Sequence, residues 1–431
     1  MIGVRSLPLA PLVSSLLCCL VSIHAQAQTP SQSVPSSVEE QYREGLYQRE
    51  TGRPYSAIDT LESVLAANPT LNRARLEVAV AYYRTLNFAK AKAQAQAVLD
   101  DPNTPDAVRL SVLSFIKQVE LDESTSFGRP HKLDLSLSLG IVHDSNVNAG
   151  PDNAVLPGGL VLEPGATYKS DGGYVLQAGL SHSWLSPTPV RSGESTGRFG
   201  WNSQLGVYYK GYGRYSEYNL GVLTAATGPA LIMGKGWRGN ISFQADRLTL
   251  GDEKLALYTS VSPSATWRLG TSGEFTADAQ LAYRNFARPD DQGRDSHYSS
   301  LGFSYGGLFN SNRLTLQAGV RTFDEDAQEA RFSNKGYEIF FGGRQNVWQG
   351  GDLFARAALR HSAYDDVEPF YGIARREDEK RLELGASQQF NTGWLDKWQG
   401  AATFTIIQNK ANLALYEYDR NILQITLGRS Y

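Results

Sequence analysis

The sequence predicts a short all-α helical-repeat domain of tetratricopeptide (TPR) type, followed by a transmembrane antiparallel β-barrel of about 14 strands. Residues 38–125 are rich in Ala, Leu, Glu and Arg, and small or apolar residues recur in them with a spacing of 34. From Lys132 to Tyr431, apolar residues instead alternate with polar ones. After residue 27, no apolar run approaches the ~18 to 20 residues of a membrane helix, so any spanning must be done by strands.

The composition agrees with this fold class. A chain of 431 residues has room for two or more domains. Its mean hydropathy of −0.33 is too polar for a bundle of membrane helices. A barrel can be this polar, because only every second residue of each strand faces lipid. The formal net charge of −3 gives no reason to expect nucleic acid as a partner.

Residues 1–27 have the features of a secretory signal peptide. Arg5 supplies the positive charge, 7–23 is apolar, and Ala25-Gln26-Ala27 fits an A-x-A cleavage site. The alternative is a membrane anchor, which prolines within the apolar stretch and the cleavage site oppose. Residues 28–37, rich in Ser, Pro and Gln, are expected to form a flexible tether.

The two cysteines, Cys18 and Cys19, both lie inside the predicted signal. Cleavage after Ala27 would leave a mature chain without cysteine, which avoids unwanted disulfides in an oxidising periplasm. Lipidation of Cys18 is the alternative, although Leu17 stands where a lipobox has a small residue.

The 34-residue period predicts two TPR-like units between residues 38 and 105, and residues 106–122 suit a capping helix. The aligned pairs are Gly45 with Ala79, Ala57 with Ala91, and Leu65 with Leu99. A plain antiparallel helix bundle without a recognition role is the alternative. A TPR surface would be concave and would bind a client peptide or protein, and Arg49, Tyr83 and Arg84 are candidates to line it.

The β region, residues 132–431, contains about fourteen alternating segments, an even number as bacterial barrels require. In the first segment, Leu133, Leu135, Leu137, Leu139 and Ile141 alternate with polar or small residues. The expected strand starts are 132, 173, 197, 217, 236, 255, 274, 297, 313, 334, 352, 379, 397 and 420. A soluble sandwich or propeller is the alternative, but a sandwich rarely runs for so many residues.

The connections alternate in length, and this predicts the orientation. Short turns occur at 233–236, 270–273, 310–312 and 349–351, and longer polar loops at 144–171, 288–296, 324–333 and 365–378. Short turns of such barrels are periplasmic and long loops extracellular, so the helical domain is expected in the periplasm. The aromatic Tyr431 on an alternating segment resembles the signal read by the barrel-assembly machinery, although Arg429 departs from that pattern.

Strand alternation also predicts which charges face the barrel lumen. The candidate lumen-lining cations are Lys210, Arg238, Arg284, Arg321, Arg344, Arg356 and Arg360, and the accompanying carboxylates are Asp246, Asp278, Glu338 and Glu383. One interpretation, which we favour, is a set of salt bridges that braces the barrel. The other is a polar conduit that attracts acidic or extended chains. The loop 144–171, rich in Gly and Pro, is a candidate plug that folds inward.

No catalytic, metal or cofactor site is predicted. His143, Asp144 and Ser145 are consecutive, and neighbouring strand residues point to opposite faces, so they do not form a triad. Zinc, Walker and nucleophile-elbow motifs are absent from the sequence. The acidic stretches 290–291 and 324–326 are expected to be solvated loop tips.

The segment from Leu137-Ser138-Leu139-Gly140 through His143-Asp144-Ser145-Asn146-Val147-Asn148, together with the order signal, helical domain and barrel, resembles the surface lipoprotein assembly modifier (Slam) family of outer-membrane translocons. The family-like positions are Asp144, Ser145, Asn146 and Asn148. The resemblance implies that the barrel conducts specific client proteins to or across the outer membrane, and that the helical domain faces the periplasm. Clients of this family are surface lipoproteins or secreted proteins, many of which bind heme or metal carriers.

We therefore expect a monomeric translocon that binds a client protein, outer-membrane lipid and, during biogenesis, the barrel-assembly machinery, with no cofactor and no nucleic acid. The alternatives are an exopolysaccharide exporter, a passive porin and an outer-membrane enzyme. A porin does not need residues 38–125, an exporter usually carries a longer repeat array, and an enzyme would need the missing site.

Overall fold

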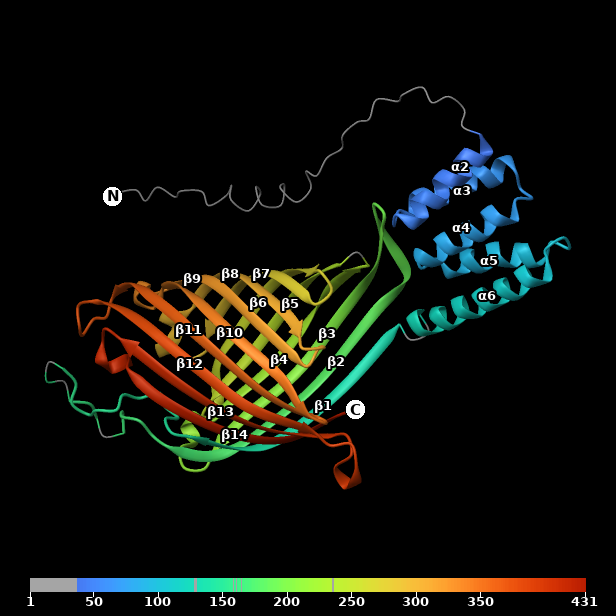
Figure 1. Cartoon of the computed structure of the whole chain (residues 1–431). Helices are drawn as coiled ribbons and strands as arrows, with labels where there is room; N and C mark the ends of the chain where they lie inside the picture. Colours follow the sequence, from blue (N-terminus) through green and yellow to red (C-terminus); the bar gives the residue numbers. More distant parts are fainter. Residues whose placement is uncertain (1–36, 128–129, 158, 160, 164, 235) are drawn as a thin grey trace, which may run out of the picture.

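The computed structural model describes residues 37–127, 130–157, 159, 161–163, 165–234 and 236–431. It has two parts, a helical domain and a closed barrel (Figure 1). The predicted signal peptide and the tether up to residue 36 lie outside the described residues. Among the described residues, no helix is both long and apolar enough to cross a membrane.

The helical domain repeats with the predicted spacing. Its helices are α2 (Val38–Glu50), α3 (Pro54–Ala67), α4 (Asn72–Arg84), α5 (Phe88–Leu99) and α6 (Asp106–Phe127). The starts of α2, α4 and α6, at 38, 72 and 106, lie 34 residues apart, as do those of α3 and α5, at 54 and 88. The 34-residue repeat of the sequence is therefore also a repeat of the helices, which form two helix pairs followed by a closing helix.

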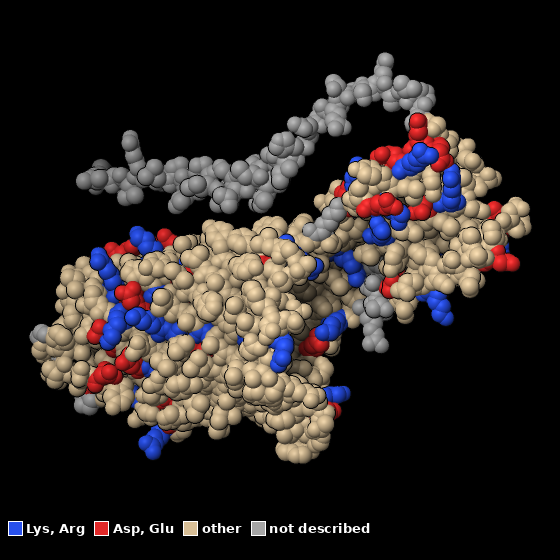
Figure 2. Space-filling view, viewed as in Figure 1, with Lys and Arg blue, Asp and Glu red and all other residues tan. Residues whose placement is uncertain are grey.

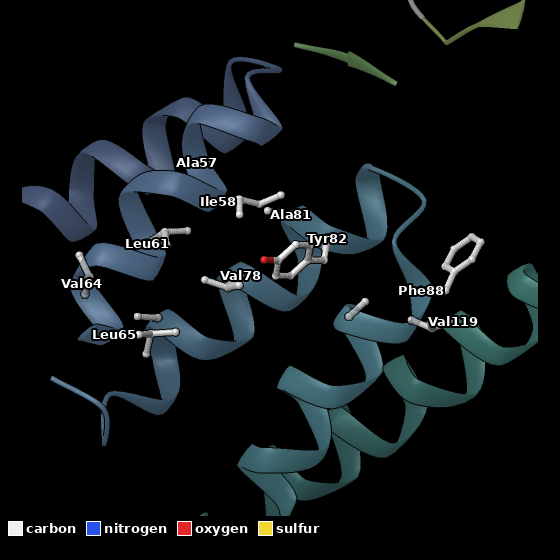
Figure 3. Close-up of a cluster of buried hydrophobic side chains, with 12 residues drawn as sticks. Ala57, Ile58, Leu61, Val64, Leu65, Val78, Ala81, Tyr82, Phe88 and Val119 are labelled. Atoms are coloured by element: carbon white, nitrogen blue, oxygen red, sulfur yellow. The ribbon is translucent and has the colours of Figure 1, made fainter. Parts of the chain in front are cut away.

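Small residues allow these helices to pack closely. A Cβ added to the buried Gly45 would lie 2.5 Å from Cγ of Leu61, so a larger residue there would push α2 away from α3. The aligned Ala79, as well as Ala57 and Ala91, are fully buried. Figure 3 shows the core that these residues border, in which side chains such as Leu61, Val78 and Val119 come from α3, α4 and α6.

The barrel has the predicted number of strands. They are β1 (His131–Asp144), β2 (Asp171–Ser192), β3 (Ser195–Tyr212), β4 (Leu220–Met233), β5 (Trp237–Leu250), β6 (Glu253–Leu269), β7 (Gly273–Phe286), β8 (Ser296–Phe309), β9 (Leu314–Ala327), β10 (Asn334–Trp348), β11 (Gly351–Val367), β12 (Ala374–Gln389), β13 (Trp398–Ala411) and β14 (Tyr418–Ser430). Each pairs antiparallel with its sequence neighbours, and β1 closes the barrel against β14. The largest error in a predicted start is at β12, expected from 379 and observed from 374.

The outer surface is suited to a lipid bilayer. The outward side chains of β1, from Leu133 to Ile141, are apolar and exposed. Few charged side chains cover the middle of the barrel in Figure 2. Apolar surface of this extent is stable only when lipid covers it, and a closed barrel satisfies its backbone hydrogen bonds without water. The chain therefore has the fold of a transmembrane, outer-membrane-type barrel.

Aromatic side chains mark the two edges of this apolar surface. All 7 tryptophans lie toward the end with the short turns, hereafter the turn end: Trp184, Trp201, Trp237, Trp267, Trp348, Trp394 and Trp398. Outward tyrosines such as Tyr174 and Tyr283 lie toward the other end, the loop end. From Tyr174 to Trp184 along a strand tilted by ~45° is about 24 Å of height, close to the ~25 Å of a membrane barrel.

The strands are longer than predicted at the loop end. β9 extends to Ala327, so residues 324–326 belong to a strand, and the expectation that they form a loop tip was wrong. The backbone ladder continues there because Glu325 points into the barrel and accepts hydrogen bonds from Arg284 and Ser296. Apolar side chains are not required once a strand has left the lipid.

The helical domain and the loop 144–171 lie at opposite ends of the barrel (Figure 1). α6 leads toward β1 at the turn end, and the β2–β3 hairpin extends beyond the barrel rim toward the helices. At the loop end, the described part of the connection from β1 to β2 runs away from the barrel (Figure 1). The structure therefore places none of these described residues in the lumen, which contradicts the expectation of an inward plug.

Candidate functional site

Asp144, the first residue of the family-like motif, is the centre of a buried ion cluster at the loop end of β1. Its carboxylate accepts hydrogen bonds from Nε and Nη2 of Arg420, at 2.9 and 2.6 Å, and from the Tyr212 hydroxyl at 2.6 Å. Nζ of Lys210 lies 3.6 Å away. Asp144 is fully buried, with 0% of its surface exposed. A fork of two charge-assisted bonds is among the stronger polar contacts, and here it joins β1 to β14.

The next motif residues continue this connection beyond the ladder. Ser145 N–H donates to the Asn421 carbonyl at 2.9 Å, and the Asn421 N–H donates back to Oγ of Ser145 at 2.8 Å. Asn146 is almost fully buried, and its Nδ2 donates to the carbonyls of Asp419 and Gly150 at 3.1 and 2.8 Å. Side chains of the motif thus form hydrogen bonds with backbone groups at the point where β1 and β14 stop pairing.

Asn148 shapes the loop itself. Its Nδ2 donates to the Thr167 carbonyl at 2.8 Å, and its Oδ1 accepts from the Lys169 N–H at 2.9 Å. These two bonds join the outgoing and returning halves of the β1–β2 loop. The motif therefore has a physical explanation in this structure: it closes the seam of the barrel and folds the adjoining loop.

All seven predicted lumen cations lie on the inward face of their strands, opposite the apolar face. Their partners are Glu274 for Arg238 (2.7 Å), Glu325 for Arg284 (2.7 Å), Asp278 for Arg321 (2.6 Å), Asp352 for Arg344 (2.5 Å) and Asp144 for Lys210. The guanidinium groups of Arg356 and Arg360 stack on the rings of Phe340 and Phe323, 4.9 and 4.2 Å from their centroids.

These ion pairs favour the bracing interpretation of the lumen charges. The Arg238–Glu274 pair joins β5 to β7 and the Arg321–Asp278 pair joins β7 to β9, so each crosses an intervening strand. Among the carboxylate partners, sequence reasoning named Asp278 but missed Glu274, Glu325 and Asp352. The pairing register between strands decides which carboxylate faces which cation. The alternation of residues along a single strand does not reveal that register.

The lumen has a second, uncharged side. Inward residues in the middle of β1, β2, β13 and β14 are mostly Ser, Thr, Gln and Gly. Near the turn end, a cavity of about 590 Å³ lies between this side and the charged side: Ser136, Ser138 and Thr426 line it together with Arg344 and Lys397. Neutral hydroxyl and amide groups can form hydrogen bonds but carry no charge.

Each predicted client-binding residue of the helical domain contacts a neighbouring helix in the row formed by α2, α4 and α6. Arg49 on α2 pairs with Glu77 on α4 at 2.8 Å, and Nη1 of Arg84 donates to the Arg49 carbonyl at 2.7 Å. The Tyr83 hydroxyl donates to Asp122 on α6, and this bond raises the pKa of Tyr83 and lowers that of Asp122. All three residues stabilise the α2–α4–α6 arrangement, and their binding of a client stays a prediction.

One close contact gave no sequence signal. Nδ1 of His131 lies 3.0 Å from Nε2 of His182, with the rings stacked across β1 and β2. In the described part of the chain, no group of three or more His, Cys, Asp or Glu side chains is placed to hold a metal ion. His143 lies on the outward face of β1 while Asp144 points inward, so the two do not form a catalytic pair.

Comparison with known proteins adds no family assignment. No family model matches the chain, and no curated protein matches its sequence. Among solved structures, the outer membrane protein OpdK of Pseudomonas aeruginosa matches with a TM-score of 0.35 at 10% identity, over 70% of this chain and 98% of that chain. A loop-deletion mutant of Vibrio cholerae OmpT gives 0.38 at 9%, over 70% and 100%. A Pseudomonas aeruginosa FadL homologue gives 0.38 at 10%, over 72% and 94%. At such scores, these matches say nothing about what the chain transports.

Proposed function

We propose that this chain is an outer-membrane translocon of Slam type, which delivers specific client proteins to or across the membrane. The observation that carries the proposal is a helical domain with 34-residue spacing at the turn end of a closed barrel with a polar lumen. Turns of such barrels face the periplasm, so the helical domain would meet clients before they enter the barrel. The clients are surface lipoproteins or secreted heme- or metal-acquisition proteins.

The size of the barrel limits the form in which a client crosses. Eight-stranded barrels are filled by side chains, and those of 16 to 18 strands hold an aqueous channel. A 14-strand barrel falls between these sizes and suits an extended polypeptide better than a folded domain. The uncharged side of the lumen would offer such a chain weak, exchangeable hydrogen bonds. The protein would act by transport, without catalysis or cofactor, as a monomer surrounded by lipid.

Comparing the surface and secreted proteomes of a gene-deletion strain and its parent tests this function. We expect one or two exported proteins to disappear, which would name the clients. An unchanged proteome with altered surface polysaccharide would instead identify an exopolysaccharide exporter. An unchanged proteome with altered solute permeability would identify a passive porin. Either of these two results would refute the translocon.

Removing the helical domain tests its contribution. A chain lacking residues 38–125 should still form the barrel, because the barrel strands pair only with one another. We expect it to lose client export, whereas a porin would keep its permeability. Shortening the β1–β2 loop by residues 151–166 is a matched control, since it removes chain at the other end of the barrel. Export that survives loss of 38–125 would contradict the proposed role of this domain.

A further inference from the structure

The β2–β3 hairpin extends past the barrel rim and ends on the helical domain. Beyond the register shift between Leu185 and Pro189, β2 and β3 still pair, from Pro189 with Arg198 to Ser192 with Ser195. The two-residue turn contains Gly193, whose φ of +58° lies in the left-handed region that glycine adopts without strain. This turn presents the side chain of Glu194 toward the helices.

The Glu194 carboxylate contacts the N-terminus of α3. It accepts hydrogen bonds from the Tyr55 N–H at 2.9 Å and from the Ser56 N–H at 3.2 Å. The Ser56 hydroxyl donates a third bond, at 2.6 Å. The first N–H groups of a helix have no partner within the helix and carry its positive dipole end, so a carboxylate is well placed there.

The N-terminus of α3 is not capped by the residue that precedes it in the sequence. In the described helical domain, the N-cap residue of α3, Arg53, makes no side-chain hydrogen bond to the helix. α2 and α5 differ, because Ser37 and Asn87 cap them in the usual way. Glu194 therefore takes the place that a Ser or Asp at residue 53 would fill.

Two further contacts surround this bond. Oγ1 of Thr196 donates to the hydroxyl of Tyr55 at 3.1 Å, and the guanidinium of Arg191 lies 4.2 Å from the centroid of the Tyr55 ring. Between the hairpin and the helices remains a cavity of about 690 Å³, whose lining includes Tyr55 and Arg191. In the described part of this interface, Glu194 accepts hydrogen bonds from Tyr55 and Ser56, and Thr196 donates a further one.

We propose that Glu194 is the positioning residue that holds the helical domain at a fixed place on the barrel, by capping α3 from the β2–β3 hairpin. α6 ends at Phe127 and β1 begins at His131, so the chain itself joins the two parts at β1, and the contact at Glu194 adds a second attachment at the β2–β3 hairpin. This attachment does not depend on what the barrel conducts, so it can be tested independently of the translocon function.

Pulsed electron paramagnetic resonance on the full chain in lipid nanodiscs tests the attachment. Spin labels at Ala66→Cys, exposed on α3, and Ser272→Cys, exposed in the β6–β7 turn, report the distance between the two parts. The only natural cysteines, Cys18 and Cys19, lie in the predicted signal peptide. We expect a narrow distance distribution for the parent chain.

Substitution of Glu194 should broaden that distribution. Glu194→Gln keeps one acceptor oxygen but loses the charge, and the ratio of docked to undocked domain should fall roughly five- to tenfold, as for the loss of a helix cap. Glu194→Lys places a cation at the positive helix end and should release the domain further. Glu253→Gln is the matched control, since it removes an exposed carboxylate at the loop end and should change nothing.

A variant on the helical side of the contact distinguishes detachment of the domain from unfolding of α3. Arg53→Asp gives α3 a cap of its own and repels Glu194, so the domain should detach although α3 stays folded. Helix content measured by circular dichroism should match that of the parent. If Glu194→Lys and Arg53→Asp both leave the distance distribution narrow, Glu194 does not hold the domain and the proposal is wrong.

Discussion

Replacing Asp144 by Asn should destabilise the barrel far more than the same change elsewhere in the lumen. Asn keeps the size of the side chain but removes its charge, which leaves Arg420 and Lys210 beside a neutral group in a fully buried place. Removing one partner of a buried ion pair costs about 3 to 5 kcal/mol, because the other charge stays desolvated.

The matched control is Asp278→Asn. Asp278 pairs with Arg321 at 2.6 Å, a distance equal to that between Asp144 and Nη2 of Arg420. The side chains of Asp278 and Arg321 are 26% and 34% exposed, however, so water in the lumen screens the pair. Pairs that water reaches contribute about 0 to 1 kcal/mol. The difference between the two variants thus measures the burial of Asp144 together with its additional partners, Tyr212 and Lys210.

Equilibrium unfolding of the purified chain in detergent, followed by circular dichroism and by the gel mobility shift of the folded barrel, measures both costs. A double variant with Arg420→Gln should recover part of the loss, because it removes a charge that Asp144→Asn leaves unpaired. If Asp144→Asn costs no more than Asp278→Asn, the buried cluster does not stabilise the seam and the reasoning from burial is refuted.

Three further outcomes follow from the contacts above. Burial raises the pKa of Glu194, but hydrogen bonds from α3 and the charge of Arg191 outweigh it and hold that pKa below its usual value. Attachment of the helical domain should therefore be complete above pH 4.5, the usual pKa of a Glu side chain, and be lost as pH falls through the lowered pKa, which the same spin-label distance reports. Gly45→Ala should lower the stability of the helical domain by about 1 to 3 kcal/mol through overpacking against Leu61, seen as an earlier thermal transition in a far-ultraviolet scan. Asn146→Ala should leave backbone groups at the seam without their partner and speed hydrogen exchange in the β1–β2 loop, while an unchanged exchange rate would show that water replaces the amide.

Much of the fold was predictable because its signals are local. Alternation along each strand identified fourteen segments, since the side chains of neighbouring residues point to opposite faces whatever the partner strand is. The error at β12 arose where Arg, Glu and Asp continue the strand outside lipid, beyond the reach of an apolar pattern. The expected loop tip at 324–326 was wrong for the same reason.

The site depended on contacts that no local pattern contains. Asp144 was singled out by a motif, but its partner Arg420 lies 276 positions away in the sequence. The inward direction of the lumen cations was predictable, whereas the acids that pair with them across a strand were mostly not. Glu194 gave no signal, because a turn of Ser, Gly and Glu looks like any solvated hairpin end.

The sequence by itself determined the repeat length of the helical domain, the number of strands, the lipid-facing side of each strand and the end of the barrel from which the helices extend. These follow from periodicity and loop length, which the chain carries regardless of its final packing. Only the tertiary structure decided the closure of β1 on β14 through Asp144 and the attachment of α3 to Glu194, 138 positions from Ser56. Each of those contacts requires two segments to meet at a distance and angle set by the whole barrel, because a hydrogen bond forms only within narrow limits of geometry.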